Sequence, residues 1–100
     1  MASIHDLYIN QGSNYSESVD LNTDYTGYTL TCDLEDSIGY NDSNFAAWDN
    51  ATTGEFTISL TSTETAALAD GIGKYNVEVT SAGGVKTRVL QGRIYVDKDI

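Results

Sequence analysis

Carboxylates come closest to forming a chemical site in this chain, since fifteen acidic residues stand against five basic ones. Five of them fall in or beside one polar segment: Asp33, Glu35, Asp36, Asp42 and Asp49. Oxygen ligands of this kind suit a hard cation such as calcium, but their spacing lacks the Asp-x-Asp-x-Asp-Gly pattern of a calcium-binding loop. We therefore expect a solvated acidic loop and no metal site.

Catalysis has little support among the remaining residue types. Cys32 is the only cysteine and His5 the only histidine, and no nucleophile motif surrounds either residue. Cys32 falls within an alternating segment, which is typical of a small buried hydrophobic residue. Acid–base catalysis needs a carboxylate in a dry cleft, whereas the acidic residues lie in polar loops or at outward strand positions, apart from Glu17 at a rim. We expect a protein that is not an enzyme and has no catalytic residues.

Anionic ligands are also disfavoured. The net charge is −10, and the basic residues are spread over the last third of the chain rather than massed in one run. We therefore expect neither nucleic acid nor a membrane surface as a partner. The glycines at 71–73 and 83–84 lead into strands rather than helices, so we expect no nucleotide and no other cofactor.

The first residues lack the basic start and apolar core of a signal peptide.

The middle of the chain organises the expected fold. Apolar residues fall on every second position at 55–60 and again at 74–79, which predicts two strands that share one core. Between them, Thr61 and Glu64 have the spacing of a capping box, which predicts a short crossover helix at about residues 62–69. We expect the apolar side chains of this helix to face the core: Ala66, Ala67 and Leu68.

Other strands are expected from the same alternation at 15–21 and 28–34, together with an edge strand at 4–9. In the strand at 28–34, the side chains of Tyr28, Leu30, Cys32 and Leu34 share the inward face. The paired glycines at 83–84 predict a tight hairpin turn, so the last two strands are expected to be antiparallel neighbours.

The last strand requires an irregularity. Its apolar residues keep one parity up to Val89 and the other parity from Leu90 onward, which predicts a β-bulge between them. Gly92 then falls in line with the core face, where its missing side chain would admit a neighbouring group.

Six or seven short strands, one short helix and no proline predict an all-β protein, an antiparallel β-sandwich that forms a single domain over residues 1–100. The segment 35–54 breaks the alternation and is expected to be an exposed loop, with a short edge strand at 45–49. Trp48 either covers one end of the core or is exposed as a binding aromatic. The candidate protein-interaction residues are Tyr40, Phe45 and Trp48.

Three runs resemble a recurrent module of tailed-phage and prophage virion proteins: GEFTISLTSTETAAL at 54–68, GKYNVEV at 73–79 and VLQGRIYV at 89–96. They are similar to the N-terminal domain of baseplate upper proteins and related tail fibres. In that family a strand ending in Leu-Thr leads into a Glu-Thr helix, a Gly-x-Tyr strand crosses the core, and a final strand carries Leu-x-Gly-x-Ile/Val-x-Val. The chain lacks the proline-rich turn common in the first half of that module.

The resemblance implies an immunoglobulin-like β-sandwich that helps to attach or assemble fibres and baseplate parts, often as a trimer. We therefore expect a non-enzymatic structural or assembly protein of a bacteriophage tail, baseplate or fibre, made in the host cytoplasm and located in the virion. Its expected partners are other virion structural proteins and, in a homo-oligomer, copies of itself. The alternative is a carbohydrate- or receptor-binding adhesin module that uses the loop from Ser37 to Asn50.

Overall fold

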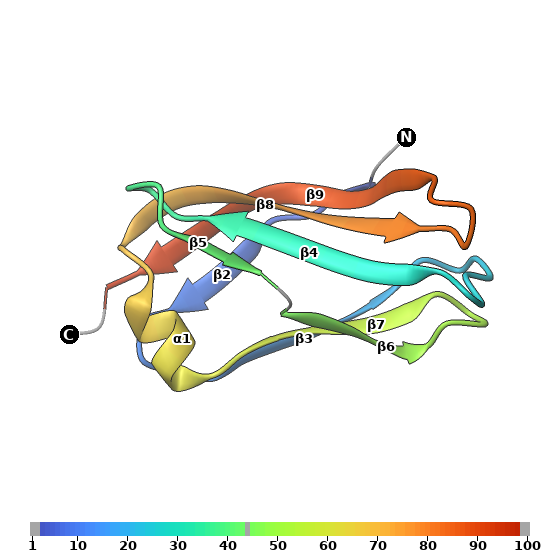
Figure 1. The fold of residues 1–100 in the computed structure, drawn as a ribbon. Coiled ribbons are helices and arrows are strands. Elements are labelled where there is room, and N and C mark those ends of the chain that lie inside the picture. The colour runs from blue at the N-terminus through green and yellow to red at the C-terminus, as the bar shows by residue number, and fades with distance from the viewer. Residues whose placement is uncertain (1–2, 44, 99–100) are drawn as a thin grey trace.

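The computed structural model describes residues 3–43 and 45–98, which form two layers of strands with one short helix at an end of the molecule (Figure 1). The molecule is elongated, with extents of 44 × 22 × 19 Å. The strands are β1 (Ser3–Ile4), β2 (Leu7–Asn10), β3 (Tyr15–Asp20), β4 (Thr29–Glu35), β5 (Asn41–Ser43), β6 (Ala46–Asn50), β7 (Glu55–Leu60), β8 (Gly71–Thr80) and β9 (Lys86–Asp97). The helix α1 spans Ser62–Ala67.

One layer is a six-stranded sheet in the order β1-β9-β8-β4-β5, with β2 also paired to β9, and the other is a three-stranded sheet in the order β3-β7-β6. The predicted β-sandwich is confirmed, but two of its details are wrong. The described residues form nine strands rather than six or seven, and β1 and β2 run parallel to β9, so the sandwich is not wholly antiparallel. Parallel neighbours need a long connection, and here most of the chain lies between them.

The edge strand expected at 4–9 is present as two short pieces. Strands β1 and β2 keep the same offset against β9, so they continue one line along the edge of the sheet. His5 and Asp6 interrupt the ladder between them. The expected strands at 15–21, 28–34 and 45–49 correspond to β3, β4 and β6, whereas β5 was not expected.

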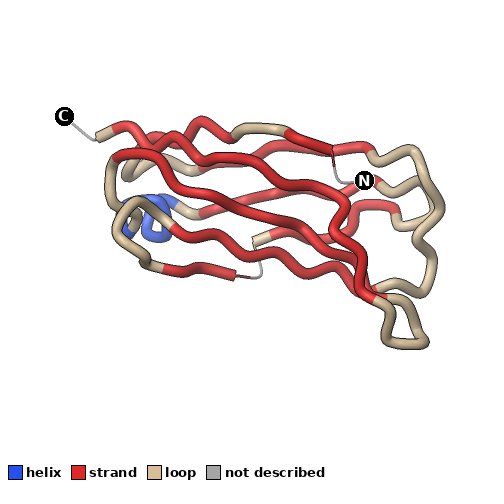
Figure 2. The backbone as a smooth tube through the Cα atoms, turned by 90° about the horizontal axis from the view of Figure 1, so that it is seen from above, coloured by secondary structure: helices blue, strands red, loops and turns tan. Residues whose placement is uncertain are grey.

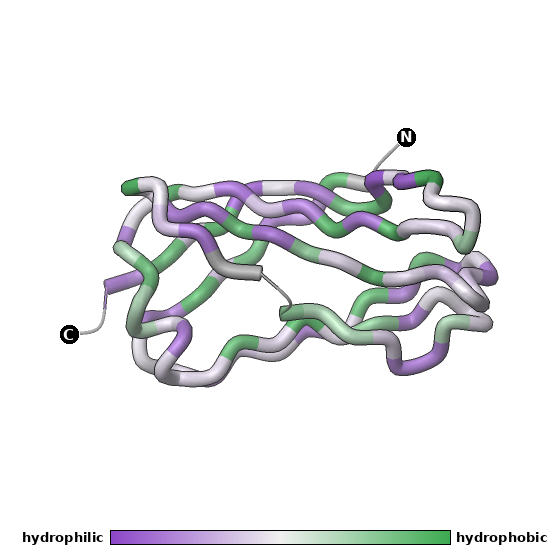
Figure 3. Tube along the Cα trace, in the orientation of Figure 1, coloured by the Kyte–Doolittle hydropathy of each residue, from purple (hydrophilic) through white to green (hydrophobic). Residues whose placement is uncertain are grey.

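The core lies between the two layers. Figure 3 shows hydrophobic and hydrophilic residues alternating along the strands, and in β7 Phe56, Ile58 and Leu60 are buried while Glu55 and Ser59 are exposed. The other buried apolar side chains are Leu7, Ile9, Cys32, Leu34, Phe45, Leu68, Tyr75, Val77, Val79, Val89, Leu90, Ile94 and Val96. The inward face expected for the strand at 28–34 holds for Cys32 and Leu34, but Tyr28 is exposed because it precedes β4.

The predicted capping box is confirmed at the start of α1. The Thr61 hydroxyl oxygen accepts from the Glu64 amide at 3.2 Å, and the Glu64 carboxylate accepts from the Thr61 amide at 2.9 Å. The helix crosses between the sheets and closes one end of the sandwich (Figure 2).

The expected core face of the helix is wrong in part. Leu68 is buried as predicted, but Ala66 and Ala67 are exposed, and the buried residue within α1 is Thr65. The Thr65 hydroxyl donates to the Ser13 carbonyl at 2.8 Å, which lets a polar side chain occupy a fully buried position. A tertiary hydrogen bond thus stabilises the buried side of this six-residue helix.

The hairpin and the bulge are both confirmed. In the turn between β8 and β9, the Ser81 amide donates to the Val85 carbonyl at 2.9 Å, and Gly84 has a φ of +87°. Val77 pairs with Leu90, but the next residue of β8 pairs with Arg88, so Val89 is the additional residue of the bulge. Val89 and Leu90 are both buried as a result.

Candidate functional site

Asp36 is a structural anchor rather than part of a solvated acidic loop. The residue is buried, and its carboxylate accepts hydrogen bonds from the amides of Ile38 at 3.0 Å, Tyr40 at 2.9 Å and Ala69 at 2.9 Å. Burial alone would raise the pKa of the Asp36 carboxyl, but these amides, that of Ala69 foremost, hold the pKa below its usual value. The carboxylate therefore ties the turn at 36–40 to the end of the helix, and the expectation of a solvated Asp36 is wrong.

The other candidate carboxylates have separate surroundings. Glu35 lies 3.9 Å from the Lys74 ammonium group, and Asp49 accepts from the Thr57 hydroxyl at 2.5 Å. The side chain of Asp42 lies outside the described residues. Among the residues that are described, no group of three histidine, cysteine or carboxylate side chains could hold a metal ion.

Within the same ranges, no helix combines the length and the apolar composition that a membrane crossing needs.

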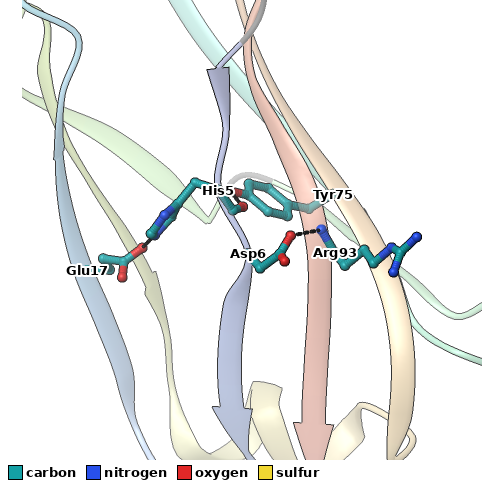
Figure 4. Close-up of polar contacts among 5 residues, drawn as sticks. All are labelled: His5, Asp6, Glu17, Tyr75 and Arg93. Atoms are coloured by element: carbon teal, nitrogen blue, oxygen red, sulfur yellow. Dashed lines mark hydrogen bonds and ion pairs between the residues drawn. The ribbon is translucent and has the colours of Figure 1, made fainter.

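Cys32 and His5 are held by different parts of the fold. Cys32 is buried as predicted, and its sulfur atom accepts from the Phe45 amide at 3.0 Å. His5 Nε2 lies 2.5 Å from Glu17 Oε2, so this contact joins the edge of the larger sheet to β3 of the smaller sheet (Figure 4). Glu17 is half-buried, as a residue at the rim should be.

The three residues expected to form a protein-interaction site do not form one surface. Tyr40 is 44% exposed. Phe45 is only 4% exposed, because the chain passes there from β5 of one sheet to β6 of the other and carries its side chain into the core. Phe45 is therefore removed from the candidate surface.

Trp48 packs as a cover over the core, the first of its two expected environments. Its indole nitrogen donates to the Tyr28 carbonyl at 3.1 Å, its ring stacks on Tyr25 at 5.8 Å, and it meets Phe56 edge-on at 6.1 Å. The Trp48 side chain is therefore packed against other residues of the same chain.

An exposed apolar row lies elsewhere, on the outer face of the larger sheet. Tyr8 of β2 stacks on Tyr95 of β9 with ring centroids 5.1 Å apart, and Tyr95 pairs in register with Ile72 of β8. Tyr8 is 70% exposed and Ile72 is 56% exposed. The sequence offered only a weak signal for this row, because it depends on the parallel pairing of the two ends of the chain.

The turn at 36–40 lies at the same end of the larger sheet as this row. The Ser37 hydroxyl donates to the Asp70 carbonyl at 2.8 Å, which places the turn beside the start of β8. Exposed Ile38 and Tyr40 belong to this turn. We refer to the exposed and half-exposed apolar residues at the α1 end of the larger sheet as the helix-end patch: Tyr8, Ile38, Tyr40, Ile72 and Tyr95.

The centre of the same outer face carries two columns of opposite charge. Asp33 and Glu35 lie on β4, whereas Arg88 and Arg93 lie on β9, with β8 between them. A surface groove of about 630 Å³ runs over this region. Asn76 of β8 contributes to the groove, and among the described residues its buried Oδ1 atom has no hydrogen-bond donor.

A second set of contacts fixes the gap between β1 and β2 (Figure 4). The Tyr75 hydroxyl donates to the His5 carbonyl, the His5 amide donates to the Gln91 carbonyl at 2.9 Å, and Asp6 Oδ1 accepts from the Arg93 amide at 3.0 Å. Asp6 binds the backbone of Arg93, and Figure 4 shows the Arg93 guanidinium group extending away from that contact.

No protein-family model and no curated protein sequence matches this chain. The resemblance to phage virion modules therefore stays a prediction. The candidate functional features are therefore the helix-end patch and the charged outer face.

Proposed function

We propose that this chain is a non-enzymatic structural or assembly domain of a bacteriophage virion, with an immunoglobulin-like sandwich, and that it binds other virion proteins through the helix-end patch. The observation that carries the proposal is the exposed stack of Tyr8 on Tyr95 beside Ile72. Large aromatic side chains dominate binding energy when a partner excludes water from them, and exposed apolar clusters mark interaction sites.

The rigidity of the scaffold supports this role. In the patch, Tyr8, Ile72 and Tyr95 lie on paired strands, and the Asp36 carboxylate fixes the turn at 36–40 through backbone amides. A surface held in this way loses little conformational entropy on binding, which suits a permanent contact in an assembled particle.

The proposal is tested in particles and with purified subunits. Mass spectrometry of purified virions from the encoding source is expected to find the protein in the particle. Binding to the co-encoded virion proteins is expected to fall at least tenfold in Tyr8→Ser and in Ile72→Ser, because each loses a large apolar contact. Val85→Ser is the matched control, since Val85 is 65% exposed at the opposite end of β8 and β9. Absence from particles, or equal losses in all three variants, would overturn the proposal.

The alternative is an adhesin module that uses the loop from Ser37 to Asn50. Trp48 of that segment packs against Tyr25, Tyr28 and Phe56, which does not favour its use as a sugar-binding aromatic. A glycan array separates the two functions. Reproducible sugar binding that Tyr40→Ala or Trp48→Ala abolishes, in variants that remain folded, would support the adhesin module over the structural role.

A further inference from the structure

We propose that the groove on the outer face of the larger sheet binds a short free peptide, in its simplest form a dipeptide, with the ligand's ammonium group at Asp33 and its carboxylate at Arg93. The site does not depend on the proposed virion function, because the described lining of the groove contains no residue of the helix-end patch.

Most charges on this face already have an opposite charge beside them. The Lys74 ammonium group lies 3.9 Å from the Glu35 carboxylate. Arg88 pairs in register with Glu78 on the neighbouring strand, where side chains directly opposite each other are close enough to interact. These four charges therefore offset one another in pairs within the chain.

Arg93 is the cation of the groove that lacks such a partner. It pairs in register with Lys74, so two positive charges lie directly opposite each other, an arrangement that destabilises a sheet. The nearby Asp6 carboxylate accepts from the Arg93 amide, and Figure 4 shows the guanidinium group extending away from that contact. Among the described residues, this guanidinium group forms no ion pair. A ligand carboxylate offsets the repulsion between the two cations and accepts two parallel hydrogen bonds from the guanidinium group.

Asp33 is the corresponding anion. It is exposed on β4, and its neighbours in register, Asn76 of β8 and Ser43 of β5, are both uncharged residues. Within the described part of the chain, its carboxylate forms no ion pair. Asp33 and Arg93 line the same groove, so a ligand that carries both an ammonium group and a carboxylate matches the two charges that the chain leaves uncompensated there.

The positions of Asp33 and Arg93 set the length of the ligand. They lie two strands apart and are offset by two residues along the strands, so their Cα atoms are separated by roughly 12 Å. Side chains stand out from a sheet roughly at right angles, and a charged hydrogen bond of about 2.8 Å at each end leaves roughly 6 Å between the two charges of the ligand. An extended chain advances by about 3.4 Å per residue, so a dipeptide spans this distance and a single amino acid does not.

The amide of Asn76 supplies a contact between the two ends. Asn76 lies between Asp33 and Gln91 in register, and its buried Oδ1 atom has no hydrogen-bond donor among the described residues. A buried acceptor without a donor destabilises the folded chain. A dipeptide carries an N–H group between its ammonium group and its carboxylate, the same order as Asp33, Asn76 and Arg93 across the groove. The terminal torsion of an asparagine side chain is soft, so its rotation can turn the oxygen toward that N–H group.

An NMR titration of the full chain with glycylglycine tests the site through backbone amide chemical shifts. Saturable shifts are expected at Asp33, Asn76 and Arg93, with a dissociation constant of about 1 mM, the order expected for so small a ligand. Arg93→Gln and Asp33→Asn are each expected to weaken binding at least tenfold, because each removes one of the two charged contacts. Lys86→Gln and Asp97→Asn are the matched controls and should bind like the wild type, since both residues are exposed on β9 and neither lines the groove.

Three analogues of the ligand separate the contacts. 5-Aminopentanoate keeps the two charges of glycylglycine at a similar separation but has no amide group, and it is expected to bind several-fold more weakly. Asn76→Leu should remove this difference, because it removes the acceptor of the amide N–H group. Acetate and methylammonium, which carry one charge each, are expected to bind at least tenfold more weakly than glycylglycine.

Each variant is first shown to keep the dispersed amide spectrum of the folded chain. The absence of saturable shifts, binding of acetate as tight as that of glycylglycine, or equal binding by Arg93→Gln and Asp97→Asn would overturn the proposal. Tyr8→Ser is expected to bind glycylglycine like the wild type, so a failure of the virion proposal and a failure of this one give different results.

Discussion

The backbone carbonyl of His5 fills the space that a side chain on Gly92 would need. A Cβ atom placed on Gly92 would lie 2.1 Å from the His5 carbonyl oxygen and 2.7 Å from its carbon. The Tyr75 hydroxyl donates to that same oxygen, and Gly92 pairs in register with Tyr75. The missing side chain on β9 thus admits the backbone between β1 and β2, as the parity of the last strand predicts.

Replacement of this glycine should be costly. Gly92→Ala is expected to lower the free energy of unfolding by about 2–3 kcal/mol, because the methyl group would displace the backbone of the edge strand. Gly83→Ala is the control, since its nearest neighbour is the Ser81 hydroxyl at 3.8 Å, and it should change stability by no more than about 1 kcal/mol. Urea unfolding measures both, and equal midpoints would contradict the steric role of Gly92.

The Asp36 carboxylate should make the free energy of unfolding depend on pH in the acidic range. Its pKa is lower in the folded chain than in the unfolded one, so its contribution is present above about pH 4 and is lost as the pH falls through the folded pKa. Asp36→Asn is expected to cost about 1–3 kcal/mol at pH 7, since one buried amide loses its acceptor. The difference from wild type should shrink in acid, and a constant difference from pH 7 to pH 2 would count against this assignment.

At alkaline pH, the free energy of unfolding should depend on the ionisation of Tyr15 and Tyr75. Burial, followed by the charge of Glu17 and a hydrogen bond to it, raises the pKa of Tyr15 to about 12. Burial, followed by the charges of Glu17, Tyr15 and Asp6, also raises the pKa of Tyr75 above its ordinary value. The unfolded chain releases these protons near pH 10, so the free energy of unfolding should fall from there toward pH 12. Absorbance titration should show a late tyrosine ionisation that Tyr15→Phe lacks; an unchanged titration would refute it.

Truncation of Trp48 should lower the free energy of unfolding much more than truncation of Tyr40. Trp48→Ala is expected to lower stability by about 2–4 kcal/mol, because it removes ring contacts with Tyr25 and Phe56 and the donor to the Tyr28 carbonyl. Tyr40→Ala should change stability by less than about 0.5 kcal/mol, since its side chain is exposed. Thermal unfolding of the two variants measures this contrast, and similar losses would show that Tyr40 is also a packing residue.

Features that depend on neighbours along the chain were predictable from the sequence alone. The alternation at 55–60, the capping box of Thr61 and Glu64, the hairpin at 83–84 and the bulge at Val89 are local patterns, and each is present. A strand period or a cap expresses the geometry of a few consecutive residues, so composition and spacing suffice to predict it.

The tertiary structure alone decided which of these elements meet. The parallel pairing of β2 with β9 brings Tyr8 onto Tyr95 from opposite ends of the chain, and the sheet order sets the acidic column of β4 across β8 from the basic column of β9. The same packing buries Asp36 among backbone amides and turns Phe45 into the core. Strand pairing depends on the packing of the whole chain, because every backbone group and apolar face needs a partner in the same fold. The spacing of residues within one strand does not specify which other strand it pairs with.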